Sequence, residues 1–294
     1  MSIDSLAEII AALCPAPGRH VPFAGVTLTR ADDPYGMIHA VYEPSFCIVA
    51  QGDKLSMLGD QAFRYGAGQG LLAAVDVPVT ARITTATPAA PYLAMSVAID
   101  PDMVAELALR QLGMPSPAEI FAPLSSHDVD QRLFDPLIRL LSLVRDAEDV
   151  TVLRPLIQQE IVWRLLNSPF GPALRHMGAR EGQAGRVRQV MAHIRAHFAE
   201  SLKVADLAAL AHMSVPSFHR HFKAVTTMTP VHYQKLIRLQ EARQRMMADS
   251  SVAAAGYAVG YESASQFSRD YRRHFGLPPA QDSAALREQM ASAL

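Results

Sequence analysis

The pattern of apolar and polar positions changes near residue 100. Between residues 21 and 99 the apolar runs are short, rich in Val, Ile, Thr and Tyr, and separated by glycine-containing turns such as Gln51-Gly52-Asp53-Lys54 and Gly59-Asp60. Short runs bounded by turn signals are typical of β-strands. They predict a small barrel or sandwich over residues 21–100, with a hairpin at residues 46–58. Residues 1–20 begin with a short amphipathic segment and are expected to form an N-terminal helix.

After Asp100 the apolar spacing becomes helical. Asp100-Pro101 supplies an N-cap followed by proline, and Gly113 is expected to end that helix. Further helices are predicted over residues 129–144 and 155–167. In the second of these one apolar stripe is expected: Leu156, Ile157, Ile161, Leu165 and Leu166. Residues 168–185 carry two prolines and four glycines, so residues 101–182 are interpreted as a helical region with a linker at its end.

A duplicated pattern dominates residues 183–294. Phe218-x-Arg220-x-Phe222-Lys223 recurs as Phe267-x-Arg269-x-Tyr271-Arg272, and Phe267 lies 49 residues after Phe218. Each copy follows a short stretch of small apolar residues and a serine, Ser214 or Ser263. A short helix, a tight turn and a second helix form a helix-turn-helix, so the pattern indicates two such motifs and double-stranded DNA as the partner.

Helical projection of the two copies gives each a buried aromatic face and an exposed polar face. Phe218, Phe222 and Val225 lie together in the first copy, and Phe267 and Tyr271 in the second. Arginine, glutamine and serine can read base edges, while flanking cations contact phosphates. The projected base-reading residues are Ser217, Arg220, Ser265, Gln266 and Arg269, with His219 on the flank, and the projected phosphate contacts are Lys223, Arg272 and Arg273.

The segment between the two copies predicts one long helix. Thr229 is a candidate N-cap, Pro230 fits the first helical position, and the helix is expected to run to Met247. Eighteen residues at 1.5 Å each give roughly 27 Å. That length is near the ~34 Å between successive major-groove segments on one face of DNA, so a single chain could read two of them.

Charge and composition separate the same two regions. The net charge is −1, but from Gln183 onward there are 14 Lys+Arg against 8 Asp+Glu, and before it 13 against 20. A basic C-terminal third of net +6 on an acidic remainder of net −7 fits a nucleic-acid reader joined to a domain of another kind. The two cysteines, Cys14 and Cys47, show no metal-binding or disulfide spacing. Without a secretion signal or membrane span, a cytoplasmic location is expected.

The C-terminal residues resemble the AraC/XylS family of transcription regulators. The matching segments are LAALAHMSVPSFHRHFKAVTTMTPVHY, RLQEARQRM and VGYESASQFSRDYRRHFGLPP, within residues 204–279. The resemblance implies base contacts from the outward positions Pro216, His219, Arg220, Ala264, Ser265 and Arg269. Pro216 and Ala264 have no hydrogen-bonding side chain. The chain departs from the family at Gly256, where alanine is usual, and at Ala280-Gln281-Asp282, where an aromatic residue and arginine often stand.

Residues 21–109 resemble the cupin-like N-terminal domain of one AraC-type subfamily, through segments such as YEPSFCIVAQGDK and FRYGAGQGLLAAVDVPVTARI. This resemblance implies a small sensing barrel followed by helices for self-association. The expected fold class is therefore α+β with two domains: a cupin-like β-barrel with a helical dimerisation segment, and an all-α domain with two helix-turn-helix motifs joined by a long helix. The expected partners are DNA, a small-molecule effector and a second copy of the chain, with RNA polymerase a further candidate.

Two alternatives remain open from the sequence. The N-terminal domain could serve only dimerisation or binding of a partner protein, or it could be a cupin enzyme. Cupin enzymes usually hold a metal on an HxH pair, a glutamate and a third histidine, whereas this region offers only His39 and, at its edge, His20. No metal, cofactor or catalytic residue is therefore expected.

His219 and His221 point to different sides of their helix, and His193 and His197 are interpreted as a solvated face. Cys47 is interpreted as a core residue. Trp163, the only tryptophan, is expected to pack among the middle helices, where its fluorescence would report self-association if it lies at that face.

Overall fold

The computed structural model describes residues 2–34, 36–110, 122–145, 147–178, 183–248 and 250–291. The chain divides into two compact units. Unit 1 comprises Met1–Ile38 and Tyr42–Gly185, and unit 2 comprises His39–Val41 and Arg186–Leu294. The first is rich in β-structure and the second is helical, which confirms the expected α+β fold class.

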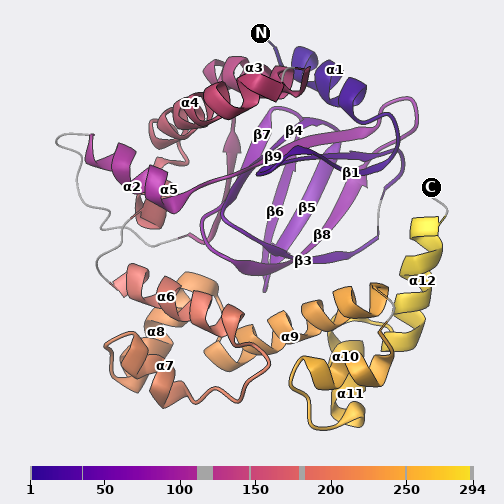
Figure 1. Ribbon diagram of the computed structural model, residues 1–294, viewed down its shortest axis with the longest axis vertical. Coiled ribbons are helices and arrows are strands. Elements are labelled where there is room, and N and C mark those ends of the chain that lie inside the picture. The colour runs from indigo at the N-terminus through magenta and orange to yellow at the C-terminus, as the bar shows by residue number, and fades with distance from the viewer. Residues whose placement is uncertain are drawn as a thin grey trace. The chain divides into compact units, whose positions relative to one another are not determined.

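The strands form two sheets in the described part of the chain (Figure 1). The strands are β1 (Gly18–Phe23), β2 (Val26–Ala31), β3 (Ile38–Tyr42), β4 (Ser45–Gln51), β5 (Asp53–Leu58), β6 (Gln61–Gly66), β7 (Gln69–Ala73), β8 (Val77–Thr85), β9 (Tyr92–Ala98) and β10 (Leu124–Asp128). One sheet has the order β1-β2-β9-β4-β7-β10 and the other β3-β8-β5-β6.

The hairpin predicted at residues 46–58 is wrong. β4 pairs with β7 and β9, whereas β5 pairs with β6 and β8, so the chain changes sheets between them. Gly52 has φ +80°, and a Cβ built there would lie 2.5 Å from the carbonyl oxygen of Thr85. The glycine therefore allows a crossing between sheets where the sequence pattern suggested a reversal.

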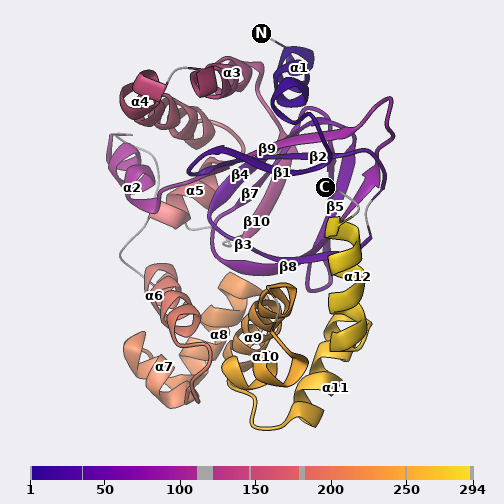
Figure 2. The ribbon, with the colours of Figure 1, turned by 45° about the vertical axis from the view of Figure 1, so that its right-hand side comes forward.

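The helices of unit 1 follow or precede the strands in sequence. They are α1 (Ile3–Leu13), α2 (Pro101–Leu109), α3 (Phe134–Ser142), α4 (Ala147–Leu166) and α5 (Gly171–Gly178), with 3-10 turns η1 (Gln131–Leu133) and η2 (Leu143–Arg145). In both views α1 and α3 lie beside each other over the sheet that contains β4 and β9 (Figures 1 and 2). Leu6 and Ile10 of α1 join Phe46 and Ile48 of β4 in one buried core.

Residues 101–182 are not wholly helical as predicted. β10 lies in this region and pairs with β7 along its whole length. A strand of sequence LSSHD carries little apolar signal, and its stability comes from pairing with a distant segment. The predicted helix over residues 129–144 is divided into η1, α3 and η2. Gly113 lies outside the described residues, and α2 ends at Leu109.

Two predicted helix boundaries also change, and the predicted linker region contains a helix. The helix predicted to begin at Pro155 begins at Ala147, because Glu148 and Asp149 provide a favourable acidic first turn ahead of the proline. The N-terminal helix, predicted within residues 1–20, ends at Leu13, and residues 168–185 contain α5. Of the predicted apolar stripe on α4, Leu156 is exposed while Ile157, Ile161, Leu165 and Leu166 are buried. Trp163 is likewise 40% exposed, not packed away.

Apart from His39–Val41 of β3, the described part of unit 2 is helical, in the order the sequence predicts. They are α6 (Gln183–Ala196), α7 (Val204–Leu210), α8 (Val215–Thr226), α9 (Pro230–Met247), α10 (Val252–Ala258), α11 (Ala264–Phe275) and α12 (Pro279–Ala291). α7 with α8, and α10 with α11, are the two helix-turn-helix pairs, and Figure 1 shows α9 running from one group to the other. Among all described residues, no helix combines the length and the apolarity that crossing a bilayer requires.

Candidate functional sites

The first helix-turn-helix is shaped by an aromatic core beneath α8. Phe218 and Phe222 are fully buried, their rings 5.5 Å apart, and Phe222 also packs edge-on against Tyr233 of α9 at 5.6 Å. Pro216 stands in the first turn of α8, and Thr227 ends the helix in the left-handed conformation. The buried aromatic face of α8 is the one that the projection predicted. Its contact with Tyr233 turns that face towards α9, so the opposite, polar face points away.

The outward side of α8 carries its charge. Arg220 and Lys223 are exposed, whereas Ser217 and His219 are half-buried. Neither cation has a carboxylate partner among the described residues, so both charges remain available to a ligand. Burial and the adjacent Arg220 lower the pKa of His221, which favours the neutral imidazole at that inner position.

The second helix-turn-helix has the same construction. Phe267 and Tyr271 of α11 are fully buried with their rings 5.5 Å apart. The side chain of Ser263 caps α11 by accepting a hydrogen bond from the backbone N–H of Gln266 at 3.4 Å. Gly256 brings α10 close to α11, because a Cβ there would lie 3.0 Å from the Phe267 ring. The family departure at Gly256 therefore coincides with close helix packing.

All the predicted contact residues of α11 are exposed: Ser265, Gln266, Arg269, Arg272 and Arg273. In the described part of the chain none of these arginines has an acidic partner. Asp270, the acid within α11, instead pairs with Lys235 of α9 at 2.6 Å. The outward face of α11 is consequently cationic and polar, the chemistry that phosphates and base edges recognise.

A buried ion pair that the sequence did not reveal anchors α11. Asp282 of α12 accepts hydrogen bonds from Arg243 of α9 at 2.7 and 3.0 Å and from the Tyr271 hydroxyl at 2.6 Å. Burial and the bond to Asp282 raise the pKa of Tyr271, so the phenol stays protonated and donates. Asp282 belongs to the segment that departs from the family pattern. Its only sequence signal was an acid where an aromatic-arginine pair is usual.

Arg238 of α9 connects the segment after α6 with the turn between α10 and α11. Its guanidinium donates to the carbonyl oxygens of Phe198 at 2.6 Å, Glu200 at 2.8 Å and Gly260 at 3.0 Å. Gly260 is the turn residue of the second motif and has φ +89°. One arginine of the connecting helix thus fixes the turn from which α11 begins.

Unit 1 contains a polar cluster between its two sheets. Lys54 of β5 lies 5.4 Å from the centre of the Tyr42 ring. Ser56, two residues along β5 and fully buried, lies 3.0 Å from the Tyr65 hydroxyl and 3.3 Å from the Tyr42 hydroxyl. Tyr92 of β9 is buried, and its hydroxyl has no hydrogen-bond partner among the residues that the structure describes.

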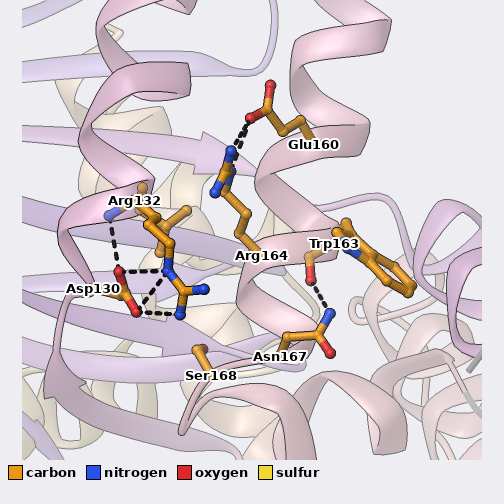
Figure 3. A pocket seen from close by; sticks show the side chains of 8 residues that line it. Asp130, Arg132, Glu160, Trp163, Arg164, Asn167 and Ser168 are labelled. Carbon is orange, nitrogen blue, oxygen red and sulfur yellow. Dashed lines mark hydrogen bonds and ion pairs between the residues drawn. The ribbon is translucent and has the colours of Figure 1, made fainter.

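A surface groove of about 420 Å³ lies where α4 approaches η1 (Figure 3). Its charged side chains are already paired: Arg132 with Asp130 at 2.7 Å and Arg164 with Glu160 at 2.6 Å. The bond from Arg132 lowers the pKa of Asp130 to about 2. Trp163 supplies the large apolar surface of this groove. The paired charges leave the groove no net preference for a charged ligand.

The histidines and cysteines form no metal-binding group of three or more ligands in the described residues. His193 and His197 stack at 4.3 Å, and the Nδ1 atom of His197 lies 2.9 Å from the carbonyl oxygen of His193. Cys47 is half-buried in β4, and burial raises the pKa of its thiol. The thiol is therefore protonated at neutral pH.

Two helix-turn-helix motifs on one connecting helix, beside a β-rich unit with two sheets, define a class of regulatory proteins. Residues 22–173 match the family model described as the AraC-type transcriptional regulator N-terminus, and residues 207–284 match a helix-turn-helix domain. The chain belongs to the AraC-type transcriptional regulators.

Curated relatives agree with this family. The transcriptional activator RhaS of Enterobacter sp. (strain 638) is 29% identical over 152 residues, which cover 51% of this chain and 54% of the relative. RhaS of Salmonella arizonae is 28% identical over 172 residues, 58% of this chain and 61% of the relative. The chain spans about half the length of the curated relatives it matches.

Solved structures show the same fold. An apo ToxT variant from Vibrio cholerae strain SCE256 superposes with a TM-score of 0.59 at 9% identity, covering 89% of this chain and 97% of that one. Unsaturated-fatty-acid-bound ToxT gives a TM-score of 0.56 at 11% identity, covering 88% and 94%. At these identities the likeness establishes the fold of the chain.

Proposed function

We propose that this protein is a sequence-specific DNA-binding transcription regulator whose β-rich unit responds to a small molecule. The observation that carries the first half is the matched pair α8 and α11. Each buries two aromatic rings and presents arginine outward without an acidic partner among the described residues. Guanidinium reads guanine bidentately, so Arg220 and Arg269 are the principal base-reading residues.

The remaining contacts follow from position and chemistry. Ser217, His219, Ser265 and Gln266 offer hydrogen bonds to base edges beside the arginines. In this proposal Lys223, Arg272 and Arg273 contact the phosphates, where they fix register without carrying sequence information. Pro216 and Ala264 offer only apolar contact.

Selection of binding sites from random DNA, followed by sequencing, tests this function. The wild-type chain is expected to enrich a defined site, whereas a variant carrying both Arg220→Ala and Arg269→Ala is expected to lose the preference. Arg19→Ala is the charge control, since Arg19 is an exposed arginine of unit 1. Recovery of unenriched DNA with wild-type protein would refute sequence-specific binding.

The sensing role has support from chemistry and from the fold. Tyr92 of unit 1 is buried, and its hydroxyl has no hydrogen-bond partner in the part of the chain that the structure describes. ToxT, which shares the fold, has been crystallised with an unsaturated fatty acid. A thermal-shift screen across a metabolite panel tests the role, because a bound ligand raises the melting temperature by mass action. A flat response would favour the alternative that unit 1 serves only dimerisation or a partner protein.

We also propose that the chain dimerises through α4. Val152, Leu156 and Trp163 are 63%, 58% and 40% exposed and are spaced four and seven residues apart, so they share one helical face. Exposed apolar side chains that share a helical face are a candidate self-association surface, here with Gln159 between Leu156 and Trp163. The regulator would act in the cytoplasm, without enzymatic activity, and RNA polymerase is a candidate partner of the DNA-bound form.

A further inference from the structure

Lys54 is the only lysine among residues 1–202, and it is directed toward the space between the two sheets of unit 1. On β5 it shares a face with the fully buried Ser56. On the neighbouring strand it lies directly opposite Tyr65. The residue as a whole is half-buried.

The ammonium of Lys54 has no carboxylate partner within the described residues. Asp53, the adjacent acid, is exposed and belongs to the opposite face of β5. The groups within electrostatic range of Lys54 are the phenols of Tyr42, Tyr65 and Tyr92 and the thiol of Cys47. Burial raises the pKa of Tyr65, Tyr92 and Cys47, so these groups are neutral at pH 7. The cluster therefore holds a cation without a compensating charge.

The same cluster holds an unused hydrogen-bond donor. The Tyr92 hydroxyl is fully buried and has no hydrogen-bond partner among the described residues, a condition that destabilises a folded protein unless a ligand or water satisfies it. Tyr92 belongs to β9 in one sheet and Lys54 to β5 in the other. A ligand between the sheets could meet the ammonium from one side and the phenol from the other.

We propose that unit 1 binds an organic carboxylate, with Lys54 as its counter-ion and Tyr92 as a hydrogen-bond donor to it. A carboxylate has two oxygens, one for the charged N–H donors and one for a neutral O–H donor. The rings of Tyr42, Tyr65 and Tyr92 supply apolar surface for the organic part. A phosphate group would require more cations than the single one present. This inference rests on the proposed sensing role and specifies the ligand class.

The test uses the full-length protein and defined probes. Benzoate and unbranched monocarboxylates from acetate to decanoate are titrated by calorimetry and thermal shift, and the corresponding primary amides serve as neutral matches. At least one carboxylate is expected to bind and raise the melting temperature, while its amide does not. Lys54→Met is expected to weaken binding roughly tenfold or more, and Tyr92→Phe roughly threefold to tenfold, since only the first removes a charge.

Two controls separate loss of the site from loss of the fold. Lys203→Met makes the same substitution at an exposed lysine of unit 2 and should leave carboxylate binding unchanged. Lys54→Arg retains the charge and should retain part of the affinity. Tyr92→Phe removes a hydroxyl that has no partner, so this variant should be at least as stable as the wild type without ligand and provides a folded test of the site.

The outcomes distinguish the carboxylate site from the proposed sensing and DNA-binding functions. If no carboxylate binds, or if Lys54→Met and Tyr92→Phe bind it as the wild type does, the carboxylate site is refuted. If a neutral metabolite stabilises the protein instead, sensing stands and the carboxylate inference falls. Selection of a DNA site is measured separately on the same preparations, so loss of DNA binding would count against the proposed regulator and not against the site.

Discussion

Asp282 connects three helices of unit 2 through two side chains. Its carboxylate is only 5% exposed and accepts from both Arg243 and Tyr271. Removing one partner of a buried ion pair leaves the other charge uncompensated, which typically costs 3–5 kcal/mol. We therefore expect Asp282→Ala to lower the opening free energy of α11 by about 3 kcal/mol, measured by native-state hydrogen exchange.

The matched control for that prediction is an exposed pair on the same connecting helix. Glu241 and Arg245 lie 3.0 Å apart and are 33% and 41% exposed. Glu241→Ala should cost no more than about 0.5 kcal/mol, since exposed pairs one turn apart contribute little. Equal costs for the two variants would show that Asp282 is not an anchor.

Arg269 and Lys223 differ in what they are expected to recognise. Arg269→Ala should relax base preference at one position of the selected site and cost roughly 1–3 kcal/mol there. Lys223→Ala should weaken all sequences about equally and reduce the slope of log affinity against log salt by about one unit. Gel-shift titrations on matched and mismatched sites at several salt concentrations measure both. An unchanged specificity in Arg269→Ala would remove α11 from the base-reading surface.

At the scale of elements, the turn between α10 and α11 determines where α11 begins. Gly260 has φ +89°, and a Cβ there would lie 2.1 Å from the carbonyl oxygen of Ala199. Gly276 has a similar φ of +82°, but a Cβ built there would have no described atom within 4 Å beyond its chain neighbours. Alanine at either position carries a strain of about 1 kcal/mol from the left-handed conformation. Gly260→Ala should cost at least about 2 kcal/mol more, because it also displaces backbone.

Hydrogen exchange of α11 and DNA affinity measure that difference together. Gly276→Ala should retain nearly full affinity for the selected site, while Gly260→Ala should lose affinity along with the protection of α11. Equal losses of affinity and protection in both variants would mean that glycine is needed at Gly260 only for its left-handed conformation, and not for the close contact with Ala199.

Local signals explain which elements the sequence predicted. The bounds of α9 agree with prediction, and the buried aromatic faces of α8 and α11 do as well, because N-caps such as Thr229 and aromatic spacings act within a few residues. β10 and the change of sheet at Gly52 were missed because they depend on pairing between distant strands. The Lys54 cluster was missed for the same reason, since strands from both sheets assemble it.

For the whole molecule, the change in net charge near Gln183 nearly coincides with the boundary between the two units at Gly185. The residues before Gln183 carry a net charge of −7 and those from Gln183 onward +6. An acidic unit is repelled by DNA phosphates, so in the proposed regulator the affinity for DNA is expected to come from the basic unit. The exposed apolar residues of α4 belong to the acidic unit, where we propose that two copies meet.

Dimerisation through α4 makes a prediction for the intact chain. Leu156→Glu places a charge on the apolar face and should raise the dimer dissociation constant at least about tenfold, because an unpaired charge is costly to bury. Leu109→Glu is the control: Leu109 is 83% exposed at the end of α2, off this face. Sedimentation velocity measures both. Trp163, the sole tryptophan, should shift its emission to shorter wavelength as wild-type dimers form and should not do so in Leu156→Glu. If Leu109→Glu weakens association as much as Leu156→Glu, the α4 face is not the dimer contact.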